Sequence, residues 1–453
     1  MHDSALRARL VTHALSGRYA GFVRTGALLA IIGGILFVLA LAGEGHHRAW
    51  QAFHVNWLFF TGLAGGSVAL TAVHKLVRAR WSGLVLRFSQ AAVAFLPVSL
   101  IGLGLIFSLG YEAIYGHMQE QLHSLPHGKA VWLSHLPMFV RLAVMLGLLF
   151  GVGWALIRAD LVPDLFLARD QVDARRRARY DAMLGGFDGS PAAREGQQRR
   201  IARLAGIYAP LYALGFTAIA FDMIMALQPH WFSNLLGGFY FMASFLGAHT
   251  LLVLLMLFGE RETGVHDLIS PKQRHDLGKL CFGFTVFWAY LMWSQYLVIW
   301  YGNLPEETGF VFSRVWGSWR PVGGAVLAGM FVIPFVGLLG VAPKKSRLTL
   351  GLFATISLTA LWLERYLLVI PSVTAEHGPA FGLPELAPTL AFLGLFLLTY
   401  GLFARTFPMV SPRLAEISLE RETHHVQVPI FEHDESPADY VSEADIEKDV
   451  HKS

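Results

Sequence analysis

The feature that most constrains the fold is a series of ten apolar stretches, each long enough to cross ~30 Å of hydrocarbon as a helix. In this sequence 54% of the residues are apolar, 15% are charged and the mean hydropathy is +0.49. That balance excludes an ordinary soluble domain and predicts an all-α polytopic membrane protein with ten transmembrane helices. The predicted spans, helices 1 to 10, cover residues 25–43, 53–73, 88–110, 136–157, 204–228, 235–258, 280–302, 321–342, 348–371 and 386–404.

Lysine and arginine provide an independent check, because cytoplasmic connections of membrane proteins are enriched in them. Taken over alternate connections, 30 of the 36 basic residues lie on one side of the predicted membrane. Only Arg141 and Arg365 lie within spans. We therefore predict that the N-terminus (1–24) and the polar tail (405–453) are both cytoplasmic. The four basic residues on the opposite side are Arg48, Lys129, Arg314 and Arg320.

Several simpler features limit the chemistry. The basic N-terminus resembles a signal peptide, but the long apolar run after it favours a retained signal-anchor helix. The single cysteine, Cys281, excludes an internal disulfide, CxxCH haem attachment and a cysteine-ligated Fe–S cluster supplied by this chain alone. The basic residues lie between apolar spans, so they indicate topology and no nucleic-acid partner. We expect no metal, and no cofactor bound covalently or by the chain's own ligands.

Two polar segments lie outside the spans. Residues 160–203 form an insertion that we expect to be helical and to lie on the cytoplasmic surface. The acid-rich tail fits either a partner-contacting strand or a disordered one. A metal site on the tail histidines is the alternative; these are His424, His425 and His433.

The chain contains an internal repeat. The pattern WxSxxP occurs at 132–137 and at 316–321, which are 184 residues apart. Asp222 and Glu364 each lie seven residues before a proline. These two acids are 142 residues apart, and the difference from the 184 residues between the WxSxxP patterns reflects the insertion. We therefore predict two duplicated four-helix bundles with the same orientation. The first bundle covers 53–228 and includes the insertion, the second covers 235–371, and the flanking helices 1 and 10 cover 25–43 and 386–404.

A polar cluster is predicted near the outer leaflet. Ionisable residues inside spans cost ~3 kcal/mol or more, so each requires a partner, a cavity or a function. One interpretation is a quinone pocket, because a quinol needs an acceptor for its hydroxyl proton. Asp222 with a nearby histidine could supply that acceptor. The alternative is an Arg141–Asp222 ion pair that locks two helices, with Arg365 and Glu364 forming a similar pair elsewhere. Arg141 and Arg365 fit such structural roles better. The candidate quinone or proton-site residues are Asp222, His230, His135, Arg141, Glu364 and Arg365.

A second candidate is a proton relay. His249 lies near the middle of its span and could pass protons between the outer cluster and Glu260 or His74 nearer the cytoplasm. A packing histidine is the favoured alternative for His249. Haem ligation is not expected, because no span offers histidine pairs at the spacing that bis-histidine haem binding within a bundle requires.

Two motifs carry a resemblance to a known family. They are FDMIMALQPHWFSNLLGGFYFMASF at 221–245 and FWAYLMWSQYLVIWYGNLPEET at 287–308. The chain resembles the NrfD or polysulfide-reductase membrane-subunit family, and within it the second quinone-binding-type membrane subunit of alternative complex III. The resemblance spans most of the ten-helix region. It implies that Asp222 and His230 are site residues. Met223 departs from the family pattern, which often has tryptophan after this acid.

The resemblance implies an integral subunit of a bacterial quinol:cytochrome c oxidoreductase in the inner membrane. The implied partners are a multihaem cytochrome c, a periplasmic Fe–S subunit, a homologous NrfD-like subunit, small membrane and monohaem subunits, and lipids, with a terminal oxidase as a further candidate. The implied ligand is a quinone, either menaquinone or ubiquinone, although quinol oxidation could belong to the homologue alone and leave this chain as a scaffold or proton path. The alternative from another class is a secondary transporter that uses Asp222, Glu364 and Arg365.

Overall fold

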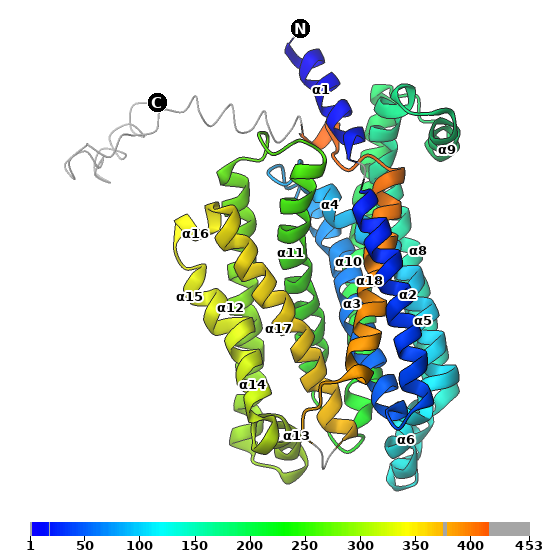
Figure 1. Ribbon diagram of the computed structural model, residues 1–453. Coiled ribbons are helices and arrows are strands. Elements are labelled where there is room, and N and C mark those ends of the chain that lie inside the picture. The colour runs from blue at the N-terminus through cyan, green and yellow to red at the C-terminus, as the bar shows by residue number, and fades with distance from the viewer. Residues whose placement is uncertain (1, 18, 375–377, 416–453) are drawn as a thin grey trace, which may run out of the picture.

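The computed structural model describes residues 2–17, 19–374 and 378–415, and every regular element within them is a helix (Figure 1). Ten helices are long and apolar enough to cross a membrane, which confirms the predicted all-α polytopic architecture. Seven spans are single helices: α2 (Ala20–Ala42), α3 (His46–Leu76), α8 (His135–Ala168), α11 (Leu236–Glu262), α12 (Pro271–Gly302), α17 (Arg347–Val373) and α18 (Leu383–Thr406).

The other three spans contain changes of helix type. The third span runs through α4 (Leu86–Gln90), a 3-10 turn, α5 (Leu96–Leu105), a π-helical turn and α6 (Tyr111–Gln121). The fifth span is α10 (Pro191–Met223) with the 3-10 turn Met225–Leu227. The eighth joins α14 (Arg320–Leu327) to α15 (Ile333–Gly337) through a π-helical turn. The shorter helices are α1 (His2–Ser16), α7 (His127–Trp132), α9 (Ala174–Leu184), α13 (Pro305–Val315) and α16 (Val341–Lys345).

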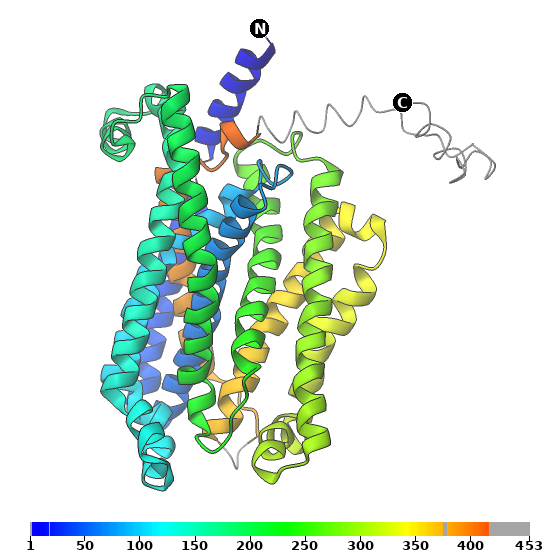
Figure 2. The same cartoon turned by 180° about the vertical axis from the view of Figure 1, so that it is seen from behind.

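The spans form two neighbouring four-helix groups, seen side by side in Figure 2. The first group contains α3, the α4–α6 span, α8 and α10, and α3 packs on α10 to close it. In the second group, which contains α11, α12, the α14–α15 span and α17, α11 packs on α17 in the same way. We call these groups the first and second bundles. The predicted duplication that relates the two groups stays a prediction.

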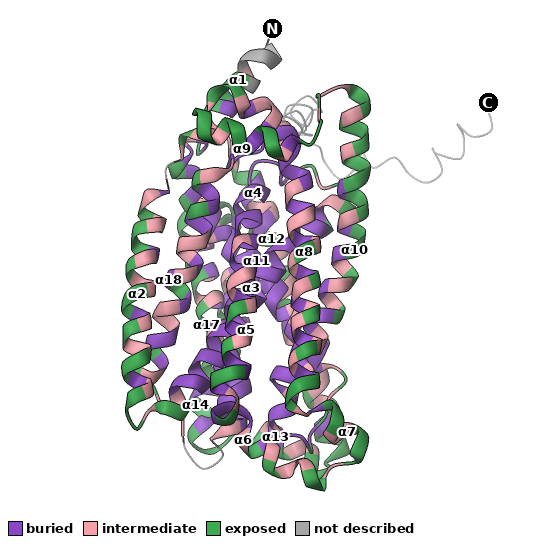
Figure 3. Ribbon diagram, turned by 90° about the vertical axis from the view of Figure 1, so that its right-hand side faces the viewer, coloured by how far each residue is buried: buried purple, intermediate pink, exposed green. Residues whose placement is uncertain are grey.

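The helix α3 lies at the centre of the molecule, in contact with both bundles (Figure 3). In an apolar 18-residue stretch of α3, 94% of the residues are buried, compared with 17% in the corresponding stretch of the N-terminal span that contains α2. The helix α2 packs along α18, and glycines on both helices allow the two backbones to touch. A Cβ atom on Gly33 would collide with the backbone of Ala391, and one on Gly394 would collide with that of Ala30. Such small-residue contacts are how membrane helices approach closely.

The described parts of the chain begin and end on the same side of the bundles. The helices α1 and α9 and the segment after α18 lie at one end, which we call the basic end (Figure 1). The helices α6 and α13 lie at the opposite end. An even number of spans places both ends of the described chain on the same side, and this agrees with the alternation of basic connections. The cytoplasmic location of the basic end stays a prediction.

The insertion differs in outline from the predicted 160–203. The helix α8 continues past residue 160 to Ala168, α9 lies separately, and α10 begins at Pro191. The segment is helical, as predicted. Its first residues nevertheless belong to the first bundle and not to the surface, because Asp160 and Asp164 are fully buried.

These two carboxylates form a buried ionic cluster at the basic end. Asp160 accepts hydrogen bonds from Lys75 at 2.6 Å and from Arg413 at 2.9 Å. Asp164 pairs with Arg87. Because the partners come from α3, α4 and the segment after α18, the cluster ties the end of the chain to the first bundle. The rest of the predicted tail, including His424, His425 and His433, lies outside the described residues.

Candidate functional site

The acid of the first bundle, Asp222 on α10, is held by Arg141 on α8. Nε and Nη2 of Arg141 each donate to a different carboxylate oxygen of Asp222, both at 2.8 Å. The guanidinium also lies 3.7 Å from the ring centroid of Trp132, and Asp222 is only 1% exposed. The ion pair that the sequence offered as the structural alternative is therefore present. A bidentate pair of this kind occupies both carboxylate oxygens.

The two histidines predicted near Asp222 have other partners. His135 places Nε2 2.7 Å from the carbonyl oxygen of Phe107. His230 is exposed, and its Nε2 lies 3.4 Å from the Ser124 hydroxyl. Within the part of the chain that the structure describes, neither histidine is hydrogen-bonded to Asp222. The quinone pocket predicted from Asp222 and a histidine stays a prediction.

The acid of the second bundle, Glu364 on α17, faces a cavity of about 360 Å³ at the end opposite the basic end. The cavity lies among α11, α12, α13, α14 and α17, and its walls are mainly apolar. Volume and lining are both typical of pockets for small organic ligands. The polar lining residues are Trp288, Gln295, Tyr296, Arg314, Arg320 and Glu364.

The carboxylate of Glu364 is buried, at 2% exposed, and incompletely bonded. Nη1 of Arg365 lies 2.9 Å from one of its oxygens, but in an orientation that makes no hydrogen bond. The indole of Trp288 also interacts with the carboxylate, again without a well-aligned hydrogen bond. Buried polar groups normally have hydrogen-bond partners. A ligand hydroxyl in the cavity could supply the missing donor.

The neighbouring Arg365 pairs with Glu364 through Nη1 and contacts α11 through its other terminal nitrogen. Its Nη2 donates to the Ser244 hydroxyl at 3.1 Å and to the Tyr240 carbonyl at 3.3 Å, and its guanidinium lies 4.2 Å from the Tyr240 ring centroid. Arg365 therefore fixes α17 against α11. This agrees with the structural role that the sequence favoured for it.

A second buried arginine lines the cavity from α13. Arg314 donates to the carbonyl oxygens of Phe310 and Leu368, both at 2.8 Å, and to the Ser372 hydroxyl. Its Nε has no hydrogen-bond partner among the described residues. Burial lowers the pKa of Arg314 to about 9, because the guanidinium loses water and gains only neutral partners. A hydrogen-bond acceptor in the cavity would stabilise its charge.

An aromatic pair supports this side of the cavity. Trp231, in the connection between α10 and α11, stacks on Phe310 of α13 with ring centroids 3.6 Å apart and planes 4° from parallel. Because Phe310 also lies under the Arg314 guanidinium, at 3.4 Å from its ring centroid, the stack holds α13 over the second bundle. The contact joins the first sequence motif, 221–245, to α13, which begins within the second motif, 287–308.

The predicted relay residues lie toward the basic end. Nδ1 of His249 is 2.9 Å from the Phe245 carbonyl oxygen, and its ring packs on Phe284. His74 lies close enough to His249 to interact electrostatically, while Glu260 pairs with Arg347 at 3.0 Å. In the described parts of the chain, no hydrogen bond joins any two of the three relay residues. His249 thus shows the contacts of a packing histidine.

Sequence reasoning missed Arg314 and Trp288 as site residues. Arg314 was assigned to an outer connection on a side that carries few basic residues, and this rarity was the available signal. Trp288 lies in an aromatic-rich motif in which no single residue stands out. Among the described residues, no group of three histidine, cysteine, aspartate or glutamate side chains could hold a metal ion.

Comparisons with known proteins do not assign a family. A scan against protein-family models and a search of curated proteins both found no match for this chain. The relationship to the NrfD family is therefore a prediction that depends on the two motifs quoted above.

Proposed function

We propose that this integral membrane protein is a subunit of a bacterial quinol:electron-acceptor oxidoreductase of the alternative complex III type, and that its second bundle binds the quinol head. The observation that carries the proposal is the buried Glu364 carboxylate, which faces an apolar cavity without an aligned hydrogen bond. The resemblance of the two motifs to the NrfD family supports the choice of a quinol over other small hydroxyl compounds. In the predicted topology, the cavity lies toward the outer leaflet.

The proposed chemistry requires the chain to bind the head and accept a proton. A quinol that becomes a quinone loses two electrons and two protons. Glu364 accepts the proton of the nearer hydroxyl, the proton of the other hydroxyl passes to water, and both protons are released toward the predicted outer surface. As the quinone forms, Gln295 and Arg314 donate hydrogen bonds to the ring oxygen farther from Glu364. The electrons leave to a redox centre held by a partner subunit, either the Fe–S protein or a cytochrome c.

The first bundle has a structural role in this proposal. Its acid is paired with Arg141, so the bundle serves as a scaffold for contacts with other subunits. The proposed partners are the multihaem cytochrome c, the periplasmic Fe–S subunit, the homologous NrfD-like subunit, and the small membrane and monohaem subunits, with a terminal oxidase as a downstream partner. The proposed location is the bacterial inner membrane.

The test compares Glu364→Gln with Asp222→Asn in the assembled complex. Quinol-dependent reduction of cytochrome c is measured per haem, so that poor assembly is not scored as lost turnover. We expect Glu364→Gln to reduce turnover about 100-fold, because a positioned base contributes roughly 10²–10⁴-fold. Asp222→Asn should retain turnover within about threefold, as expected for a group outside the reacting site.

Two results would redirect the proposal. Wild-type turnover in Glu364→Gln would mean that the homologous subunit alone oxidises quinol and that this chain is a scaffold. Solute uptake into liposomes by the isolated chain, without redox partners, would instead support a secondary transporter.

A further inference from the structure

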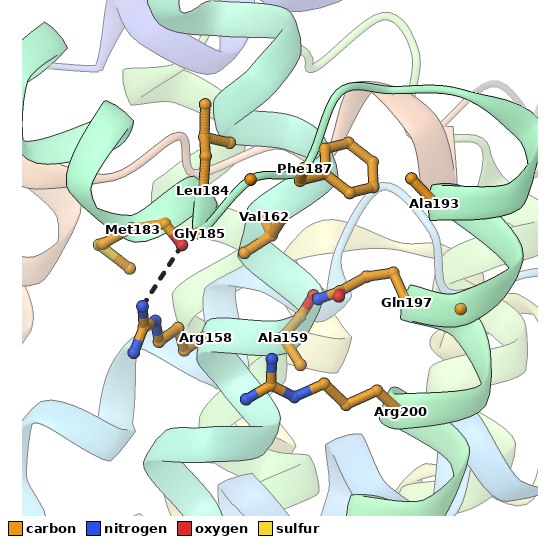
Figure 4. Close-up of a pocket in the computed structure, with 12 residues that line it drawn as sticks. Arg158, Ala159, Val162, Met183, Leu184, Gly185, Phe187, Ala193, Gln197 and Arg200 are labelled. Carbon is orange, nitrogen blue, oxygen red and sulfur yellow. Dashed lines mark hydrogen bonds between the residues drawn. The ribbon is translucent and has the colours of Figure 1, made fainter.

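A second cavity lies at the basic end, between α8, α9 and α10 (Figure 4). Its volume is about 270 Å³. Arg158 enters it from α8, while Gln197 and Arg200 enter from α10 (Figure 4). The turn after α9 closes it through Gly185 and Gly186, whose φ angles of 56° and 85° lie in the region that favours glycine. The cavity is separate from the proposed quinol site.

Hydrogen bonds hold the walls of this cavity in place. Nε2 of Gln197 donates to the Ala159 carbonyl at 2.6 Å and ties α10 to α8. Nη2 of Arg158 donates to the Met183 carbonyl at 3.4 Å and links α8 to α9 (Figure 4). The two hydrogen bonds therefore tie α8, α9 and α10 together around the cavity.

The electrostatics of the cavity favour an anion. Its lining contains two arginines and no acidic residue. Among the described residues, neither Arg158 nor Arg200 forms an ion pair. The adjacent Arg199 differs, because it pairs with Glu195 on its own helix at 3.5 Å. Two guanidinium groups that share a space without a carboxylate provide the fork geometry that phosphate groups accept.

The position of the cavity indicates the source of the phosphate. The helices α8 and α10 are both membrane spans, and the cavity lies where they emerge at the basic end. Val162, Leu184 and Phe187 add apolar surface beside the arginines. We propose that this cavity binds the phosphate group of an anionic phospholipid in the leaflet at the basic end. Basic pockets between helices are suited to such headgroups, because anionic leaflets concentrate them there.

Lipid titration of the full-length chain in neutral detergent tests this assignment. Native mass spectrometry would count lipid adducts as phosphatidylglycerol or phosphatidylcholine is added. We expect phosphatidylglycerol to bind more tightly, and the double variant Arg158→Gln/Arg200→Gln to reduce its affinity about tenfold, to the level of phosphatidylcholine. The control Arg199→Gln removes a charge outside the cavity and should change affinity less than about twofold.

A second variant separates the cavity from net charge. A Cβ atom on Gly196 would meet nothing within 4 Å, so Gly196→Leu places bulk in the cavity without a backbone collision and retains both arginines. Loss of phosphatidylglycerol binding in Gly196→Leu would support the site. Wild-type binding by the double arginine variant would overturn it. Displacement of the lipid by inorganic phosphate alone would overturn the assignment to a lipid.

Discussion

The two bundles carry acids at matching positions in different surroundings. In the first bundle, both oxygens of Asp222 are bonded to Arg141. In the second, Glu364 lines a cavity and lies 2.9 Å from Nη1 of Arg365, without an aligned hydrogen bond. At the 184-residue offset of the WxSxxP pattern, the position of Arg141 is occupied by Ala325. The two acids therefore differ in their surroundings: Asp222 is bonded on both oxygens, whereas Glu364 borders a cavity.

The residues near Arg141 and their counterparts in the second bundle explain why the second bundle contains a cavity. Phe139 in the first bundle packs on Phe107 with ring centroids 5.4 Å apart. Its counterpart at the same offset is Gly323, where a Cβ atom would lie 2.8 Å from the Arg314 carbonyl oxygen. The glycine thus allows α13 to approach α14 and brings Arg314 to the cavity. In the second bundle, Gly323 and Ala325 thus occupy the positions of the Phe139 ring and the Arg141 guanidinium in the first bundle.

The largest expected effect comes from breaking the ion pair of the first bundle. Arg141→Ala leaves the buried Asp222 without its counter-charge and should lower the free energy of unfolding by about 3 kcal/mol. Thermal and denaturant unfolding of the purified protein in detergent would measure this loss. The double variant Arg141→Ala/Asp222→Ala should recover most of it, because no unpaired charge remains. Equal stability of the wild type and the single variant would contradict a structural role for the pair.

A smaller stability loss is expected for the arginine of the second bundle. Arg314→Gln removes hydrogen bonds to the neutral Leu368 carbonyl and Ser372 hydroxyl. It leaves no buried carboxylate unpaired, so the expected loss is about 1–2 kcal/mol. The same unfolding experiment would check this value. A loss as large as that of Arg141→Ala would show that the two arginines have equivalent roles and would remove the distinction between the bundles.

Filling the cavity should affect binding more than stability. Gly324 lines the cavity, and a Cβ atom there would meet nothing within 4 Å. Gly324→Leu should weaken quinone binding about tenfold, equivalent to about 1.4 kcal/mol, and leave the melting temperature near the wild-type value. Fluorescence quenching by a short-chain quinone would give the affinity.

The matched control for this variant is Val140→Leu, at the corresponding position of the first bundle. Val140 is 49% exposed, so the change should leave quinone affinity within about twofold. Equal loss of affinity in both variants would place the quinone outside the second bundle.

The smallest effect is expected for His230→Ala. The side chain is exposed and contacts only the Ser124 hydroxyl among the described hydrogen bonds. Quinol turnover in the assembled complex should stay within about twofold of the wild type. A loss of tenfold or more would return the quinol site to the first bundle, where the sequence motif suggested it.

The number of spans could be predicted because hydropathy reports it directly. The rotation of each helix about its axis could not be predicted. This rotation determines whether Asp222 contacts Arg141 or a histidine. The buried cluster at Asp160 was missed because α8 continues past its apolar stretch, where charged residues resemble a surface loop. The role of Arg314 depends on how α13 folds over the second bundle, which no local pattern specifies.

Photoaffinity labelling with an azidoquinone, followed by peptide mapping, tests the central claim most directly. Labelling of the assembled complex should modify peptides from α12, α13 and α14 in this chain, and Glu364→Gln should reduce that labelling. Asp222→Asn should leave it unchanged. Labelling of α8 and α10 around Arg141, or only of another subunit, would contradict a quinol site in the second bundle.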